Sequence, residues 1–254
     1  MTTKSRSYQS TTAYHWSRLP KESLLNTRIC DLGLSLDGSP LVPRIKRLYQ
    51  ELQRQHFKFQ PHCWLSDEWF CPDDIPGIAI PFFLAHPRLK RLELDFISEV
   101  EGGDTNWCMK LLRHETAHAL ANAYRLPQRN DWRKLFGNPN APYRDTYLPD
   151  PYNKHFVINL PGWYAQSHPH EDWAETFAVW LNPSSHWATH YQQWPALKKL
   201  LFVDALMHEI KQKPPVLRNK RISHPVEKIR TTLQTYYKNK IQYYHHSNGL
   251  RLLR

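Results

Sequence analysis

One stretch of this chain combines helical spacing of apolar residues with strong helix formers. Residues 106–124 read NWCMKLLRHETAHALANAY, which contains no Pro or Gly and is rich in Leu, Ala, Met and Glu. Asp104 or Thr105 can cap the N-terminus, and Pro127 closes the pattern. The sequence therefore predicts a helix over residues 106–124.

A second helical pattern lies within residues 164–181. Pro169 suits the first turn of a helix, and acidic residues follow it near the predicted N-terminus, where the helix dipole favours negative charge. An apolar stripe completes the pattern and consists of Trp173, Phe177, Trp180 and Leu181. We therefore expect a second amphipathic helix here.

Weaker patterns predict the remaining elements of a mostly helical α+β protein. Helical spacing appears in three further segments, Leu41 to His56, Trp194 to Lys211 and Pro225 to Tyr237. Strand-like patterns appear in Gly77 to Leu84, where Pro81 limits the strand to an edge or a bulge, and in the alternating Leu92, Leu94 and Phe96. Residues 137–163 form a long connection rich in Pro, Asn and Tyr, which we expect to line a cleft.

The first predicted helix carries a pattern with specific chemistry. His114, Glu115 and His118 spell H-E-x-x-H, which is typical of zinc-dependent peptidases. Residues four apart share one face of a helix, so both imidazoles can reach one ion, and the Glu can reach a water beside it. An exposed helix with two ordinary histidines is the alternative interpretation.

The third ligand is expected from the second predicted helix. Tyr124 and Ala121 occupy the positions that the metzincin pattern assigns to His and Gly, so that class is excluded. Glu171 can complete the site, and Glu175, one turn later, can accept the N–H of a ligand His, with Asp172 as a weaker candidate. A solvated acidic first turn is the alternative.

Two histidines flank Pro169 just before the proposed third ligand. His168 and His170 are therefore alternative ligands or substrate contacts, although histidines of a surface loop are more common. Their role stays open at the level of sequence.

These motifs resemble a bacterial family described as "putative zinc-binding metallopeptidase", of the gluzincin type. The resemblance runs from about Trp69 to Tyr237 and includes GIAIPFFLAHPRLKRLE, LRHETAHAL, YAQSHPHEDWAETFAVWL and WPALKKL. The third-ligand region is also similar to the metallopeptidase domain of anthrax lethal factor, where a Tyr lies seven residues before the liganding Glu. Tyr164 occupies that position here.

The resemblance implies a zincin-like fold, with a small twisted sheet beside the H-E-x-x-H helix. It also implies hydrolysis of peptide bonds in a peptide or protein substrate. One Zn²⁺ ion would be held by His114, His118 and Glu171, with Glu115 as general base. Tyr164 would stabilise the oxyanion, or would alternatively be a packed aromatic residue.

Charge is concentrated at the C-terminal end of the chain. From Lys198 onward, thirteen Lys and Arg face three acidic residues, so this segment carries +10 of the formal net charge of +11. Interleaved tyrosines suit nucleic acid or another polyanion, whereas a solvated helix face is the simpler interpretation. Two alternatives follow, a polyanion-binding protein with a structural or vestigial zinc site, and a DNA-associated protease resembling the SprT group.

Length and composition predict one domain with extensions. We expect a loose segment at residues 1–20, a zincin-like domain at 21–212 and a basic helical extension at 213–254. The N-terminal residues lack the apolar core of a signal peptide, and no apolar run is long enough to span a membrane. The expectation is a soluble cytoplasmic protein.

The cysteines agree with a reducing compartment. Cys30, Cys63, Cys71 and Cys108 form no C-x-x-C pattern and are expected to be reduced structural thiols. His62, Cys63 and Cys71 could form part of a second metal site, but the sequence shows no fourth ligand.

Overall fold

The structure is a computed structural model that describes residues 14–144 and 147–247. Helices are its main secondary structure. The helices are α1 (Lys21–Leu25), α2 (Val42–Arg54), α3 (Pro87–Ile97), α4 (Thr105–Tyr124), α5 (Asn130–Phe136), α6 (Pro169–Leu181), α7 (Trp187–His190), α8 (Leu197–Ile210) and α9 (Leu233–Ser247). Two strands, β1 (His62–Ser66) and β2 (Gly77–Pro81), form a parallel sheet. The predicted α+β class is confirmed.

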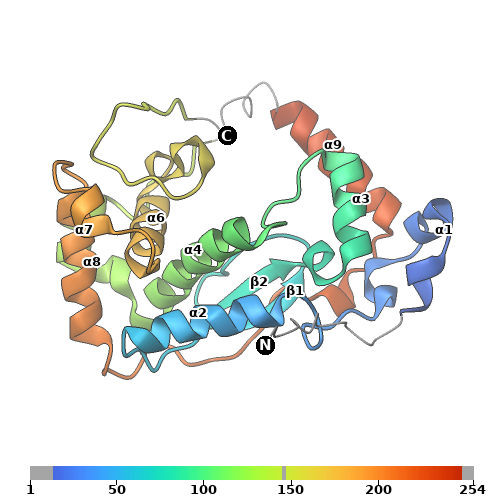
Figure 1. Cartoon of the computed structure of the whole chain (residues 1–254), viewed down its shortest axis with the longest axis horizontal. Helices are drawn as coiled ribbons and strands as arrows, with labels where there is room; N and C mark the ends of the chain where they lie inside the picture. The colour runs from blue at the N-terminus through green and yellow to red at the C-terminus, as the bar shows by residue number, and fades with distance from the viewer. Residues whose placement is uncertain (1–13, 145–146, 248–254) are drawn as a thin grey trace, which may run out of the picture.

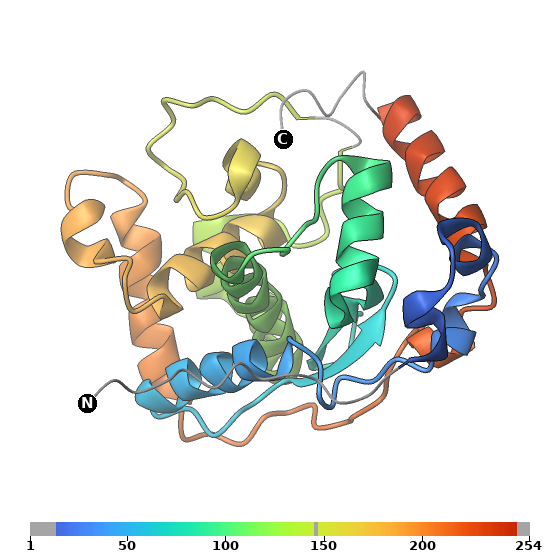
Figure 2. The ribbon, with the colours of Figure 1, turned by 45° about the vertical axis from the view of Figure 1, so that its right-hand side comes forward.

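Helix α4 lies at the centre of the molecule. It packs against α6, α2 and β2, and α8 packs against the outer side of α6. Helices α3 and α9 pack against each other, on the other side of α4 from α6 and α8 (Figure 1). The turned view keeps the same order, with α4 between the two helical groups (Figure 2).

Local interactions define both ends of α4. The Asp104 carboxylate accepts hydrogen bonds from the backbone N–H groups of Asn106 and Trp107 at 2.8 and 2.9 Å. A cap of this kind stabilises a helix by about 1 kcal/mol. The helix ends at Tyr124, because Arg125 adopts the left-handed conformation with φ 52°. The predicted helix over residues 106–124 is therefore confirmed, with Asp104 as its cap.

A buried ion pair holds α4 against α2. Nε and Nη2 of Arg113 each donate to a different carboxylate oxygen of Glu51 at 2.8 Å. Both side chains are almost fully buried, so each charge depends on the other for solvation. Because Arg113 immediately precedes His114, this pair restrains the turn that carries the motif.

The segment that alternates Leu92, Leu94 and Phe96 is a helix, so the strand predicted there is wrong. The His86 imidazole accepts from the backbone N–H of Arg88 and caps α3. Leu89 and Leu92 are buried at helical spacing, whereas Leu94 is exposed. Alternation over three residues is too short to distinguish a strand from a helix whose apolar face includes positions 89, 92 and 96.

Strand β2 confirms the β-like run that begins at Gly77, but it ends at Pro81 rather than Leu84. Phe82–Ala85 forms a 3-10 turn instead. Every residue of β2 is buried, and its partner β1 was not predicted. The sheet contacts α4 through β2, so the small sheet expected beside this helix is confirmed.

Tertiary contacts shift the start of the last helix. We expected it to begin at Pro225, whereas α9 begins at Leu233. The backbone N–H groups of Ile29 and Cys30 donate to the carbonyls of Thr231 and Ile229 at 3.0 and 2.9 Å. These bonds hold residues 229–231 extended, because a carbonyl that accepts from a distant segment of the chain is not free to accept the hydrogen bond of a helix.

Both chain ends contribute to the core where they are described. Residues 1–13 lie outside the described residues, but Trp16 is fully buried and donates through Nε1 to the Leu32 carbonyl at 2.7 Å. Most of the loose segment expected at residues 1–20 lies outside the described residues, so that expectation stays a prediction. Leu233 and Tyr237 of α9 are buried as well. The division of the chain at residue 212 stays a prediction.

Some cations of the basic C-terminal segment form ion pairs inside the protein. The Lys199 ammonium lies 2.6 Å from Asp172, and the Lys240 ammonium lies 2.9 Å from Glu93. These two cations are largely buried, so they are not part of a solvated basic face. Contact of this segment with a polyanion stays a prediction.

Within residues 14–144 and 147–247, no helix combines the length and the apolar character required to cross a bilayer.

Candidate metal centre

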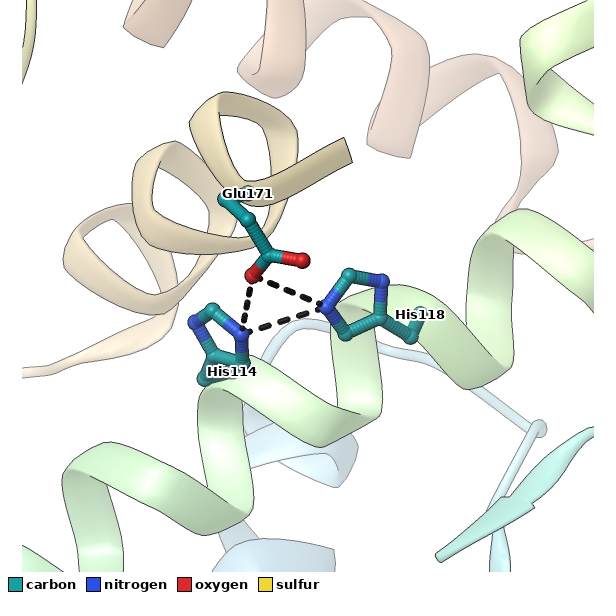
Figure 3. A group of neighbouring side chains, drawn as sticks. All are labelled: His114, His118 and Glu171. Atoms are coloured by element: carbon teal, nitrogen blue, oxygen red, sulfur yellow. Dashed lines mark hydrogen bonds and ion pairs between the residues drawn. The ribbon is translucent and has the colours of Figure 1, made fainter. Parts of the chain in front are cut away.

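Three side chains from two helices converge on one point. Nε2 of His114 and Nε2 of His118 lie 3.1 Å apart. Oε2 of Glu171, which projects from α6, lies 3.0 Å from the first of these nitrogens and 3.5 Å from the second. Figure 3 shows the three atoms facing one another across the interface between α4 and α6. The structure therefore brings together the three residues that the sequence selected.

The spacing of these atoms fits a small divalent cation. Ligand atoms placed tetrahedrally around zinc are separated by about 3.4 Å, given metal–ligand distances of about 2.1 Å. Oε2 of Glu171 is buried, and apart from the two imidazole nitrogens it has no hydrogen-bond partner. A metal ion between these atoms would coordinate this oxygen and offset the cost of burying its charge. Among the described residues, this is the one group with metal-ligating geometry.

The packing of α6 on α4 sets this geometry. The indole Nε1 of Trp173 donates to the backbone carbonyl of Ala117 at 2.9 Å, which links the two helices directly. Ala117 and Ala174 are both fully buried, and small buried side chains of this kind let packed helices approach closely. Glu171 and Glu175, one turn apart, consequently face α4 together.

Glu175 holds His114 in a defined orientation. Its Oε1 accepts from Nδ1 of His114 at 2.8 Å, so the lone pair of Nε2 is directed into the site. The same carboxylate accepts from the Asn159 side chain at 2.8 Å and from the backbone N–H of Leu160 at 2.7 Å. Glu175 is fully buried, and these donors offset the cost of burying its charge.

The electrostatics of the site favour a positive charge at the point of convergence. Burial opposes the charged form of His114, but hydrogen bonds and charge from Glu171 and Glu175 outweigh it and raise the pKa of His114 well above its ordinary value. Burial also opposes the charge of Glu171, yet His118 and His114 hold its pKa well below its ordinary value. Two carboxylates beside two imidazoles thus form a binding environment for a cation.

Glu115 and Tyr164 lie in a cleft beside the three converging atoms. This cleft has a volume of about 480 Å³, and His114, Glu115 and Tyr164 all line it. Glu115 is buried, and burial raises the pKa of its carboxyl. The Tyr164 ring is centred 5.7 Å from the His114 ring. Both residues are therefore within the reach of a substrate that contacts the metal centre.

The backbone before Tyr164 reverses direction sharply. Gly162 and Trp163 both adopt positive φ, at 75° and 51°. The left-handed region is easily populated by Gly and is uncommon for Trp, so this turn is held by its surroundings. Leu160 and Pro161, at the end of the long connection, line the cleft as well. The expectation that this connection forms a cleft wall agrees with their position.

Asp172, the weaker candidate for orienting a ligand His, has other partners. Its carboxylate accepts from the Lys199 ammonium at 2.6 Å and from the Thr176 hydroxyl at 3.5 Å. The hydrogen bond to His114 comes instead from Glu175. Glu171 and Asp172, which are adjacent in the sequence, have different partners, because positions one residue apart on a helix face different neighbours.

His168 and His170 have structural environments that do not include the converging atoms. Nδ1 of His168 accepts from the backbone N–H of His170 and caps α6, while its Nε2 donates to the Ala141 carbonyl at 2.7 Å. The His170 ring lies 5.7 Å from the Trp132 ring. Neither residue belongs to the metal-ligating group, so the sequence-level alternative of direct ligation is not supported.

Two residues of the site were missed at the level of sequence, Tyr143 and Asn159. The Tyr143 hydroxyl donates to Oε1 of Glu171 at 2.9 Å, and its ring stacks on His168 at 3.8 Å. Asn159 donates to Glu175. Both come from the long connection, whose Asn and Tyr content gave no indication of which residues would meet the carboxylates.

The alternative second metal site at His62, Cys63 and Cys71 does not form among the described residues. The His62 ring nitrogen Nε2 bonds to the Arg221 carbonyl at 2.8 Å. Burial raises the pKa of the Cys63 thiol to about 12, which disfavours the thiolate that metals require. All four cysteines are free thiols.

Comparison with known protein families assigns the chain. Residues 109–241 match the model of the family described as "Putative zinc-binding metallo-peptidase". The match spans more than half of the chain and includes His114, His118 and Glu171, the three residues of the candidate metal centre. This chain belongs to that family. The resemblance to this family that the motifs indicated is confirmed. No curated protein or solved structure shows significant similarity to the chain.

The role of Glu175 leads to a first prediction. Glu175→Gln removes the charge that orients His114, so we expect zinc affinity to fall by about 10- to 100-fold. Competition with a chromophoric chelator measures this change. Asp172→Asn is the matched control, because it removes a neighbouring buried carboxylate that binds Lys199. Equal losses of zinc affinity in the two variants would contradict the assignment of Glu175.

Proposed function

We propose that this protein is a zinc-dependent metallopeptidase that hydrolyses peptide bonds with a water molecule. The observation that carries the proposal is the convergence of His114 Nε2, His118 Nε2 and Glu171 Oε2 within 3.5 Å of one another. These three residues would hold one Zn²⁺ ion. Three protein ligands leave a fourth position open, which is typical of catalytic rather than structural zinc.

The protein residues around that position have distinct roles in the proposed reaction. When bound, Zn²⁺ supplies a Lewis acid that polarises a carbonyl and lowers the pKa of water towards about 7. The Glu115 carboxylate takes a proton from the attacking water and then passes it to the leaving amine. The raised pKa of Glu115 brings it closer to the pH at which such an exchange is efficient.

Two further residues would prepare the site for this reaction. Tyr164 lines the same cleft as Glu115, and its hydroxyl would donate a hydrogen bond to the oxyanion of the tetrahedral intermediate. Glu175 would keep the His114 ring in the tautomer that directs Nε2 into the site. The expected compartment is the cytoplasm, in agreement with four free thiols.

Removal and return of the metal test the proposal. We expect the zinc-loaded protein to cleave a mixed pool of unstructured peptides, and the chelator-treated protein to be inactive. One equivalent of Zn²⁺ should restore cleavage, whereas Mg²⁺ should not, since a site with two imidazoles suits zinc better than magnesium. Mass spectrometry of the peptide pool detects cleavage. A fully zinc-loaded protein that leaves every peptide intact would contradict the proposal.

A further inference from the structure

The two carboxylate oxygens of Glu171 have different partners. Oε2 lies 3.0 Å from Nε2 of His114 and 3.5 Å from Nε2 of His118, and both dashed lines from Glu171 in Figure 3 start at this one oxygen. Oε1 instead accepts a hydrogen bond from the Tyr143 hydroxyl at 2.9 Å. One oxygen is thus directed at the point of convergence, while the other is engaged by a residue of the long connection.

This difference matters because a carboxylate can bind a metal ion through one oxygen or through both. Binding through both oxygens adds a ligand atom and fills space beside the ion. A zinc site that activates water needs an open position next to three protein ligand atoms. The hydrogen bond to Oε1 favours binding through Oε2 alone, because Oε1 would lose its donor if it turned towards the metal.

A stacked imidazole fixes the ring of Tyr143. The centroids of the Tyr143 and His168 rings lie 3.8 Å apart, and the ring planes differ by 14°. Tyr143 is 59% exposed, whereas His168 is 4% exposed and therefore provides a buried, well-supported surface. The contact between the rings holds the hydroxyl of this partly exposed residue against the buried Glu171.

Both ring nitrogens of His168 are themselves bonded. Nδ1 accepts from the backbone N–H of His170 at 3.1 Å and caps α6, and Nε2 donates to the Ala141 carbonyl at 2.7 Å. Ala141 lies two residues before Tyr143, so one imidazole fastens the start of α6 to the segment that carries the hydroxyl. Because α6 also carries Glu171, the donor and the acceptor are held by the same local structure.

We propose that Tyr143 is a positioning residue of the metal centre. Its hydroxyl holds Glu171 so that Oε2 alone faces the ion, and His168 holds the Tyr143 ring in place. This inference rests on the proposed function, because it assigns a role towards the Zn²⁺ ion of the same site. Tyr143 would orient a carboxylate ligand as Glu175 orients His114, and such partners of ligands strongly affect metal sites.

Tyr143→Phe tests the hydroxyl alone, since it keeps the stacked ring and removes the donor to Oε1. The full-length protein is loaded with one equivalent of Co²⁺, whose visible bands shift and weaken when a fifth ligand atom joins four. We expect the variant to bind one Co²⁺ ion per chain, with bands that are shifted and weaker than those of the wild type. Wild-type bands in the variant overturn the inference.

Tyr147→Phe is the matched control. It removes a hydroxyl from the same connection, but this hydroxyl donates to the backbone carbonyl of Gly162 at 2.9 Å. The Co²⁺ bands of this variant should equal those of the wild type. A change of the same size in Tyr143→Phe and Tyr147→Phe overturns the inference, because it would not depend on the bond to Glu171.

His168→Asn tests the support of the Tyr143 ring. Asparagine is a good cap for α6, but it removes the stacked ring and the bond to Ala141. We expect its Co²⁺ bands to change in the same direction as those of Tyr143→Phe. The double variant should show no further change, because both substitutions act through one carboxylate oxygen. Additive changes overturn the role of His168.

Zinc-loaded proteins separate this inference from the proposed function. Tyr143→Phe should retain one zinc ion per chain and lose about tenfold or more in kcat, because Oε1 would compete with water for the open position. Changed Co²⁺ bands, with a zinc-loaded wild type that cleaves no peptide, would support the role of Tyr143 and contradict the peptidase. Cleavage by the wild type, with unchanged bands in Tyr143→Phe, would support the peptidase and contradict the role of Tyr143.

Discussion

Glu115→Gln is expected to keep its zinc and to lose about 10²- to 10⁴-fold in kcat/KM for any peptide that the wild-type protein cleaves. Glutamine has nearly the same shape as glutamate but does not accept a proton from water at neutral pH. The three converging atoms belong to His114, His118 and Glu171, so metal binding should remain. Zinc content by mass spectrometry and cleavage of a quenched fluorescent peptide measure the two properties.

The comparison with Glu175→Gln makes this prediction specific. That variant should lose activity in proportion to its lost zinc, because its carboxylate orients His114 rather than contacting the substrate. Glu115→Gln should lose activity at full zinc occupancy. If Glu115→Gln retains a tenth or more of wild-type activity, which is well above the loss expected for a general base, Glu115 is not the base.

His118→Ala is expected to abolish stable zinc binding. Only two donors of the converging group would remain, and bound zinc should fall from about one ion to about 0.1 or less per chain after dialysis against a mild chelator. Peptide cleavage should be lost with it. Thermal unfolding offers an independent readout, because a metal bound only to the folded state raises the midpoint of the wild-type protein but not that of the variant.

His170→Ala is the matched control for that variant. His170 lies on the same helix as Glu171 and beside it in the sequence, but it does not belong to the converging group. It should keep about one zinc ion per chain, in line with a site of three protein ligands. If His118→Ala retains stoichiometric zinc while His170→Ala loses it, the set of ligands proposed here is wrong.

The helices with long, uninterrupted patterns were predictable, whereas strand β1 and helix α3 were not. Helix α4 contains twenty residues with a side-chain cap at Asp104, and these signals are local. Strand β1 has no comparable signal, since it depends on pairing with β2. The segment containing Leu92 and Leu94 shows that a brief alternation of apolar residues is compatible with either type of structure.

The candidate site was predictable to the extent that it depends on spacing within a helix. His114 and His118 share a face because they are four residues apart, and Glu171 and Glu175 do so for the same reason. The donors from the long connection were not predictable, because Asn159 and Tyr143 reach the carboxylates only through the path of the folded chain. Sequence spacing contains no information on that path.

By itself, the sequence determined the two helices, the ligand types and the family to which the chain belongs. The tertiary structure alone decided that Glu175 contacts His114 while Asp172 contacts Lys199. The physical reason for this division is that helical periodicity determines only which residues a few positions apart share a face. The rotation of α6 against α4, which the Trp173 hydrogen bond to Ala117 helps to set, arises from packing between distant segments.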